Sequence, residues 1–143
     1  VGSEMCIRDR LKQLSIYAEN KKGALQTMTN ALYEAGINIW GSVTNDGAEY
    51  GINRMVVSDP DKAKEVLTEK GYLCRFVDVL AVEIEDKPGA LNTLLTALLD
   101  SNVNVDYTYL SFNRDSSTPV MILHTADPEE VEICLRAKGF KMV

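Results

Sequence analysis

The segment EDKPGALNTLLTAL at residues 85–98 repeats the pattern of ENKKGALQTMTNAL at residues 19–32. Eight of these 14 positions are identical, and ten of 35 are identical when residues 11–45 are paired with residues 77–111. Further along the chain, Asp59-Pro60 recurs as Asp127-Pro128. A repeat of about 66 residues is longer than the ~20–50 residues of a solenoid unit. The sequence therefore predicts two copies of one small domain, residues 11–76 and residues 77–143.

The composition is typical of a globular protein, with 143 residues of which 45% are hydrophobic. A domain of ~60 residues buries only ~60% of its unfolded surface, so we expect each half to be stabilised by another module or another chain. No apolar run approaches the ~18–20 residues that span a bilayer, and nothing resembles a signal peptide. We therefore expect no membrane association and a cytoplasmic location.

The net charge of −6 comes from residues 77–143, which carry 5 basic and 11 acidic side chains. Residues 11–76 are neutral overall, and no basic stripe is available to follow phosphates, so nucleic-acid binding is disfavoured. The three cysteines, Cys6, Cys74 and Cys134, have no metal or redox spacing, and an odd number argues against a disulfide framework. No phosphate-binding glycine loop is present. We expect neither a metal nor a cofactor.

Residues 1–10, with the sequence VGSEMCIRDR, have no counterpart in the repeat. They show neither a strand period nor a helix period. We expect a non-native N-terminal tail that takes no part in the fold.

Hydrophobic periodicity predicts the same order of elements in both halves. Alternation of apolar and polar residues indicates strands, and apolar residues three and four apart indicate helices. Aspartate followed by proline at 59–60 and 127–128 is typical of a capped helix start. In the first half, Asn45-Asp46-Gly47 predicts a hairpin turn. The expected elements of the first half are strands near residues 14–18, 37–43, 50–57 and 72–76, with helices near 25–35 and 60–70. Those of the second half are strands near 80–84, 103–109 and 120–124, with helices near 91–99 and 128–138.

This order, strand–helix–strand–strand–helix–strand, defines a ferredoxin-like split βαβ unit of the α+β class. Right-handed crossovers place both helices on one face of an antiparallel sheet. The other face is expected to carry apolar residues and to pair with another module. The residues assigned to that face are Tyr17, Trp40 and Met55 in the first half, and Leu110, Phe112 and Met121 in the second.

The break before each first helix is the motif that points to a ligand. Lys22-Gly23-Ala24-Leu25 and Pro88-Gly89-Ala90-Leu91 leave the backbone N–H groups of a helix start uncovered, and these groups suit a carboxylate. Asn38 and Asn104 stand at the matching start of the second strand, where an amide offers both a donor and an acceptor. Taken singly, each feature is also explained as a tight turn or a turn residue.

The chain resembles the ACT domain family at these positions. Asp86-Lys87-Pro88-Gly89-Ala90-Leu91, a leucine-rich helix and Asn102-Val103-Asn104-Val105 look like one ACT module. Asn20-Lys21-Lys22-Gly23-Ala24-Leu25 with Gly36-Ile37-Asn38-Ile39 looks like a second, and the resemblance covers residues 11–143. It implies two tandem ferredoxin-like modules that pair side by side. It also implies binding of a free amino acid where the first loop of one module faces the second strand of its neighbour.

Carried over residue by residue, the resemblance implies a ligand site in each copy. The first copy has Lys22 where proline is usual and Asn20 in place of the acid, so we expect variants there to have smaller effects on binding. The implied ligand-binding residues are Asn20, Lys22, Gly23, Ala24, Leu25, Asn38 and Ile39 in the first copy, and Asp86, Pro88, Gly89, Ala90, Leu91, Asn104 and Val105 in the second.

Catalytic interpretations find little support. His124 is the single histidine, and a strand residue or an edge contact explains it. Glu83 and Glu85 share a strand face and can be interpreted as an acid/base pair, although an exposed strand face explains them as well. Cys74 and Cys134 are expected to be small buried hydrophobic residues.

The sequence thus predicts a non-catalytic regulator that senses a free amino acid and forms a homodimer. Two alternatives remain open. One is a regulatory subunit that binds a metabolic enzyme in trans without a ligand of its own. The other is an enzyme, since ferredoxin-like folds host small acid/base catalysts.

Overall fold

A computed structural model describes residues 11–19, 21–45, 50–113 and 115–143. The expected N-terminal tail, Asn20 and most of the Asn45-Asp46-Gly47 turn lie outside the described residues. The chain divides into two compact units, here called module 1 (Lys12–Val77) and module 2 (Asp78–Val143). Each module is described by itself.

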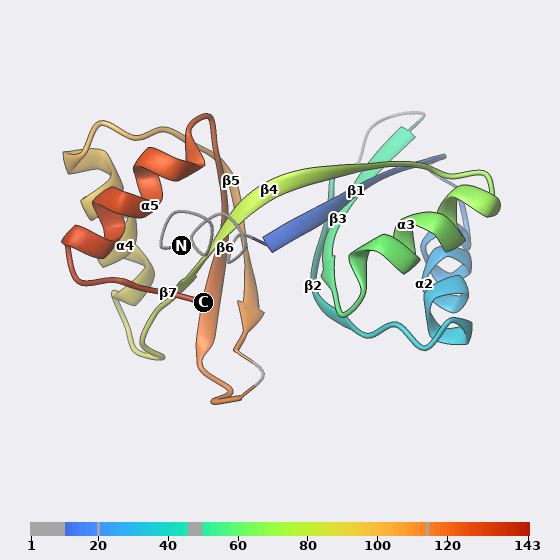
Figure 1. Ribbon diagram of the computed structural model, residues 1–143, viewed down its shortest axis with the longest axis horizontal. Coiled ribbons are helices and arrows are strands. Elements are labelled where there is room, and N and C mark those ends of the chain that lie inside the picture. The colour runs from blue at the N-terminus through green and yellow to red at the C-terminus, as the bar shows by residue number, and fades with distance from the viewer. Residues whose placement is uncertain (1–10, 20, 46–49, 114) are drawn as a thin grey trace, which may run out of the picture. The chain divides into compact units, whose positions relative to one another are not determined.

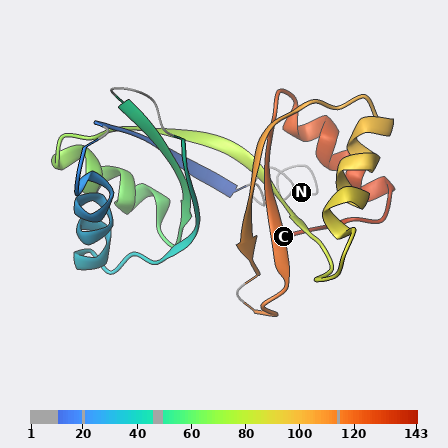
Figure 2. The same cartoon turned by 180° about the vertical axis from the view of Figure 1, so that it is seen from behind.

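Module 1 has the expected order of elements, and its two helices cover one face of its sheet (Figures 1 and 2). The strand order is β2-β3-β1-β4, with β3 antiparallel to both β1 and β2. The elements are β1 (Leu11–Glu19), α2 (Ala24–Glu34), β2 (Ile39–Asn45), β3 (Tyr50–Val57), α3 (Pro60–Glu69) and the first residues of β4 (Leu73–Glu83).

Module 2 repeats this arrangement. The strand order is β4-β6-β5, and the short β7 pairs with the other edge of β4. The elements after β4 are α4 (Ala90–Asp100), β5 (Val105–Phe112), β6 (Pro119–Thr125), α5 (Pro128–Ala137) and β7 (Lys141–Met142). Both modules therefore confirm the ferredoxin-like α+β fold, with antiparallel sheets and the helices on one face.

The expected strands at 72–76 and 80–84 are one element. β4 runs without a break from Leu73 to Glu83, so its first residues complete module 1 and the rest begin module 2. The sequence contains no glycine, proline or polar turn between Phe76 and Leu80 that would end the strand.

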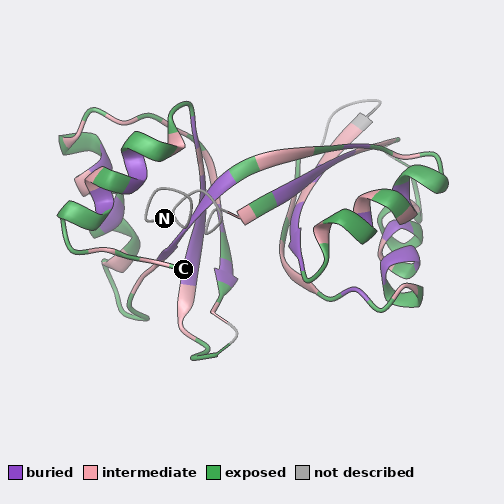
Figure 3. Ribbon diagram, viewed as in Figure 1, coloured by how far each residue is buried: buried purple, intermediate pink, exposed green. Residues whose placement is uncertain are grey.

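Each module has its own apolar core between helices and sheet, seen as the buried parts of strands and helices in Figure 3. In module 1, β1 contributes Leu14 and Ile16, and the helices contribute Leu32 and Leu67, all with 0% exposure. The corresponding residues of module 2 include Leu80, Val82, Leu94, Leu98 and Leu135. These residues fall at matching places in the two copies of the repeat, which explains why one fold forms twice.

A β-bulge at the start of the second strand decides which side chains face the helices. The register against the next strand shifts between Ile39 and Gly41 in module 1, and between Val105 and Tyr107 in module 2. An extra residue in one strand reverses the alternation of faces beyond it. Thr108, Leu110 and Phe112 therefore face the helices, whereas uninterrupted alternation from Val105 would have placed Tyr107 and Tyr109 there.

The residues expected on the sheet face away from the helices were wrong in four cases. Met55 lies opposite Leu14 in the register and is buried under the helices, and Met121 lies in the core of module 2. Leu110 and Phe112 also lie on the helix-facing side, but at the edge strand, where they are 51% and 55% exposed. β3 and β6 have apolar residues on both faces, so alternation alone did not distinguish the faces and the pairing register did.

The second helix of each module is capped as expected. The Asp59 carboxylate accepts from the Lys62 N–H at 3.2 Å, and the Asp127 carboxylate accepts from the Glu130 N–H at 3.4 Å. Each helix has proline in its first turn. The caps satisfy N–H groups that the helix itself leaves without acceptors.

We expect Asp59→Ala and Asp127→Ala each to lower the free energy of unfolding by about 1 kcal/mol, because each removes a helix cap. Urea denaturation followed by circular dichroism measures this loss. Glu65→Ala, at an exposed position in the middle of α3, is the control and should change stability by no more than a few tenths of a kcal/mol. Equal effects of Asp59→Ala and Glu65→Ala would show that the cap does not stabilise α3.

Candidate ligand-binding site

The first helix of each module begins differently from the second. α2 follows Gly23 (φ 83°) and α4 follows Gly89 (φ 87°), and neither start has a side-chain cap among the described residues. Left-handed backbone of this kind favours glycine because it has no Cβ. A Cβ built on either glycine would meet nothing within 4 Å, so the space in front of both helix starts is open.

The tight turn uses only part of the donor capacity of these helix starts. The Ala24 N–H donates to the Lys21 carbonyl and the Ala90 N–H to the Lys87 carbonyl, both at 3.2 Å. The next N–H groups, those of Leu25 and Leu91, have no acceptor within the helix by helix geometry. Together with the positive end of the helix dipole, they form a donor group suited to an anion.

An acid and a base flank each helix start. Lys21 Nζ lies 3.6 Å from Glu19 Oε2, and Lys87 Nζ lies 2.7 Å from Glu85 Oε2. These pairs are the E-x-K letters of the repeated motif. All four side chains are more than 60% exposed, so the pairs add little to stability. They leave one negative and one positive group beside the donors of the helix.

A cavity lies between the first helix and the edge of the sheet in each module. In module 1 the α2 cavity, of about 330 Å³, is lined by Ala18, Glu19, Lys21, Ala24, Leu25, Met28, Thr44, Gly51 and Asn53. In module 2 the α4 cavity, of about 510 Å³, is lined by Ile84, Glu85, Asp86, Lys87, Gly89, Ala90, Leu91, Asn92, Leu95, Leu110, Phe112 and Pro119. Lys22 and Gly23 border a second hollow beside the α2 start.

Most of the predicted loop residues therefore gather at the helix starts. Asp86, Gly89, Ala90 and Leu91 line the α4 cavity, and Pro88 is their neighbour in the chain. Ala24 and Leu25 line the α2 cavity. Asn20 lies outside the described residues.

The second-strand asparagines do not join these loops within their own modules. The Asn38 N–H donates to Ser58 Oγ and its carbonyl accepts from the Ser58 N–H, both at 2.9 Å. Asn104 lines a different cavity of about 400 Å³, together with Asp106, Thr125, Asp127 and others. Their neighbours Ile39 and Val105 pack against the two cores. A site that combines a helix-start loop with a second-strand asparagine would therefore take the loop and the asparagine from two different modules.

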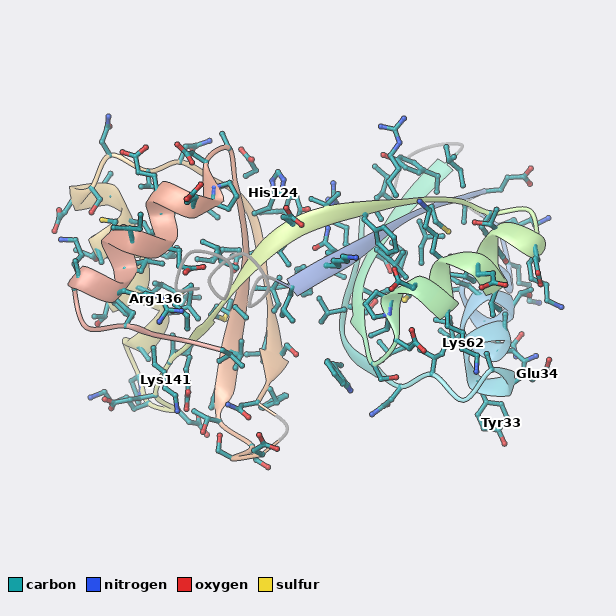
Figure 4. All side chains as sticks on the ribbon, viewed as in Figure 1. Tyr33, Glu34, Lys62, His124, Arg136 and Lys141 are labelled. Atoms are coloured by element: carbon teal, nitrogen blue, oxygen red, sulfur yellow. The ribbon has the colours of Figure 1, made fainter. Side chains whose placement is uncertain are left out.

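His124 is held in a fixed arrangement at the end of β6 (Figure 4). Its Nδ1 lies 2.9 Å from Asp106 Oδ2, and its ring stacks on that of Tyr107 with a centroid distance of 4.9 Å. Asn104 Nδ2 donates to the other Asp106 oxygen at 3.4 Å. The cluster ties β5 to β6 just beyond the bulge, which agrees with a structural role for this histidine.

The two carboxylates considered as an acid/base pair have different partners. Glu83 Oε2 lies 3.4 Å from Lys141 Nζ on β7, whereas Glu85 pairs with Lys87. Figure 4 shows Lys141 beside the end of β4. Cys74 is 7% exposed, and burial raises the pKa of its thiol although the nearby Lys64 opposes the shift. A protonated, buried thiol is a poor nucleophile.

Sequence reasoning missed three polar residues on the helix-facing side of the sheet in module 1, of which Asn53 is buried and Ser42 and Thr44 are exposed. Ser42, Thr44 and Asn53 lie on the helix-facing side of β2 and β3, because the bulge turns Ser42 and Thr44 inward. Asn53 had a detectable signal: it shares its strand face with Met55 and Val57, both of which are buried. Over the described ranges, no helix is long and apolar enough to cross a membrane, and no group of His, Cys, Asp and Glu side chains is suited to a metal.

Comparison with known proteins agrees with this geometry. A profile of the family described as ACT domain pair matches residues 9–142. The crystal structure of protein BT0572 from Bacteroides thetaiotaomicron is similar, with a TM-score of 0.86 and 30% identity over 94% of this chain and 92% of that chain. Comparison with curated proteins gives no match.

Two more distant structures share the fold. One is the ligand-free regulatory subunit of aspartate kinase from Thermus thermophilus, with a TM-score of 0.62 and 17% identity. The other is the regulatory subunit of aspartate kinase from Thermus flavus, with a TM-score of 0.59 and 20% identity. Each match covers 89% of this chain and 90% of the other. The family match over nearly the whole length shows that this chain belongs to the ACT domain pair family.

We expect iodoacetamide to label Cys74 much more slowly in the folded protein than in urea, because burial keeps the thiol protonated and covered. Peptide mass spectrometry assigns the label to each cysteine, and the half-buried Cys134 gives an internal comparison. Since the folded pKa lies above the ordinary 9.0, the associated stability is complete below pH 9.0 and is lost as the pH rises toward the folded value. Equal labelling rates in the folded and unfolded protein would contradict burial of Cys74.

Proposed function

We propose that this protein is a non-catalytic regulator that senses a free amino acid. The observation that carries the proposal is the uncapped Gly-Ala helix start, flanked by a Glu–Lys pair, in both modules. The second helix of each module is capped by its own aspartate. The same fold thus contains both capped and uncapped helix starts. The lack of a cap at α2 and α4 is therefore not general to the helices of this fold, and it favours a ligand there.

The chemistry of the helix start matches the backbone groups of an amino acid. The ligand carboxylate accepts from the N–H groups that follow Gly23 or Gly89 and is favoured by the helix dipole. The ligand ammonium is attracted by Glu19 or Glu85, and Lys21 or Lys87 adds positive charge near the carboxylate. Zwitterionic recognition of this kind needs no catalytic group, and we assign the protein no enzymatic activity, metal or cofactor.

Completion of the site requires a neighbouring module, which we propose a second copy of the chain supplies. Asn104 and Gly89 border different cavities of module 2. In this proposal the asparagine therefore lies against the loop of a module in the second copy. β2 and β5 are the two ends of the strand order, and edge strands are where further modules can pair. Beside β5, the exposed Leu110, Phe112, Leu91 and Leu95 form an apolar surface suited to burial in a homodimer.

The proposed setting is the cytoplasm. Neither nucleic acid nor a membrane is proposed as a partner, because the chain has a net charge of −6 and no basic stripe. The structures of similar fold include two regulatory subunits of aspartate kinase. These support a regulatory role only through the shared fold.

A second candidate function is that of a subunit that regulates a metabolic enzyme in trans. The observation in its favour is the set of large apolar side chains on outward helix surfaces: Tyr33, Leu99 and Ile133 are 79%, 76% and 64% exposed. Figure 4 shows Tyr33 pointing away from the end of α2. Co-purification of an enzyme without a thermal shift from any amino acid would favour this candidate.

The first test is a thermal-shift screen against the twenty amino acids. A ligand at ~100 times its dissociation constant should stabilise the protein by ~2.7 kcal/mol. We expect Gly89→Asp to weaken binding at least tenfold, or ~1.4 kcal/mol, because a carboxylate then occupies the place of the ligand's own. Gly23→Asp acts in the same way and should have a smaller effect, because the first copy departs further from the family pattern. Gly89→Asn and Gly23→Asn add a side chain of the same shape without charge and should weaken binding less. Wild-type affinity in both folded aspartate variants would exclude the helix starts as the site.

The second test concerns assembly. We expect a homodimer with an interface above ~1,000 Å² in total, seen as twice the monomer mass by light scattering at micromolar concentration. Leu110→Lys should produce monomers because it places a charge in the proposed apolar interface. Ile133→Lys, at a more exposed position on α5, is the control and should remain dimeric. A monomeric wild-type protein would contradict this arrangement.

A further inference from the structure

The two modules differ most where the edge strand faces the first helix. Pairing across the hairpin places Thr44 beside Asn53 in module 1, and Leu110 beside Met121 at the matching place in module 2. The register to the first strand confirms the match, since Asn53 lies opposite Ile16 and Met121 lies opposite Val82. One fold therefore carries a polar pair and an apolar pair at the same position.

Asn53 is held in place, and its hydrogen bonds to other described residues leave part of its bonding capacity over. It is 3% exposed, its Nδ2 donates to Thr44 Oγ1 at 2.7 Å, and its Oδ1 accepts from Ser42 Oγ at 3.4 Å. A carboxamide has two N–H donors and an oxygen with two lone pairs. These two bonds use half of that capacity, and the side chain lines the α2 cavity.

The fold itself does not require this polar group. Module 2 builds the same sheet with Met121 at the matching position. Burial of an amide in place of an apolar side chain costs stability unless its hydrogen bonds are satisfied. Asn53 therefore has a use that Met121 does not serve.

We propose that Asn53, with Thr44, selects the side chain of the bound ligand, and that the ligand is an amino acid with an uncharged polar side chain, a hydroxyl or a carboxamide. This inference rests on the proposed function, since the ligand's carboxylate and ammonium are held at the α2 start and by Glu19. The spare donor and acceptor of Asn53 then meet a group that can accept and donate in turn.

The cavity excludes other classes of side chain. An apolar side chain would cover the spare groups of Asn53 without offering them a partner, which is costly. A charged side chain would compete with the ligand's own ammonium and carboxylate for Glu19 and Lys21, and at the far wall it would meet Asn53, a neutral amide. In module 2 the α4 cavity has Leu110 and Phe112 instead, so we assign side-chain selection to module 1, although its loop departs further from the family pattern.

The test compares isosteric ligands by calorimetry on the full chain. L-threonine against L-valine, and L-asparagine against L-leucine, differ mainly in polar groups. We expect one member of the set serine, threonine, asparagine and glutamine to bind at least tenfold more tightly than its apolar counterpart. Asn53→Met and Thr44→Leu, which install the residues of module 2, should each reduce that preference by tenfold or more.

Control variants separate selection from folding. Thr108→Val removes a hydroxyl from the matching face of module 2 and should leave the preference unchanged. Asn53→Asp keeps the shape of the side chain but removes its N–H donors. This variant replaces Asn53→Met in the test if Asn53→Met does not fold.

The outcomes distinguish this inference from the proposed function. Tight binding of valine or leucine, or an unchanged preference in Asn53→Met and Thr44→Leu, overturns the inference while the proposed amino-acid binding stands. Absence of binding by any amino acid overturns both. A polar preference that is lost in these two variants and kept in Thr108→Val supports the inference.

Discussion

The bulge at the start of each second strand is the constraint on which the rest of the structure depends. Ile39 and Val105 pack into the cores, and one residue later the alternation of faces reverses. For every residue of the edge strand beyond that point, this reversal decides whether the side chain lies on the helix-facing side or on the other side of the sheet. The bulge puts Ser42 and Thr44 on the helix-facing side in module 1, and Leu110 and Phe112 on the same side in module 2. Without the bulge, other side chains of the edge strand would line the α2 cavity and the α4 cavity.

The repeated fold separates what the two modules must share from what they are free to change. Both keep the core leucines of the first strand and first helix, the left-handed glycine before that helix, and the aspartate cap of the second helix. The edge strands β2 and β5 do not share this pattern. It is there that the modules diverge, from a hydrogen-bonded polar wall in module 1 to an apolar one in module 2. In the function proposed above, one copy would recognise a side chain while the other offers a surface for association.

Helix starts show a similar division between stability and binding. A capped start satisfies its own donors, as Asp59 and Asp127 do for α3 and α5. An uncapped start leaves donors that only solvent or a ligand can satisfy, and the open space before Gly23 and Gly89 keeps them reachable. The Glu–Lys pair beside each uncapped start contributes little stability at such exposure, yet it presents both charges that a zwitterion requires.

The sequence by itself determined the duplication, the order of strands and helices and the position of the caps, because these depend on local periodicity and on residues with strong local preferences. Asp59-Pro60 and the leucines at helical spacing are examples, and the family match over residues 9–142 agrees with the resemblance read from the loops. Sequence also located the Gly23 and Gly89 turns.

Only the tertiary structure decided which faces were buried. Met55 and Met121 belong to the cores because of the pairing register, and Leu110 faces the helices because of a bulge. In strands that are apolar on both faces, the local sequence pattern indicates neither the pairing register nor the position of a bulge. The role of Asn53 was hidden for the same reason: its partners Ser42 and Thr44 stand on another strand, and their approach depends on an inserted residue whose effect appears only when the strands pair.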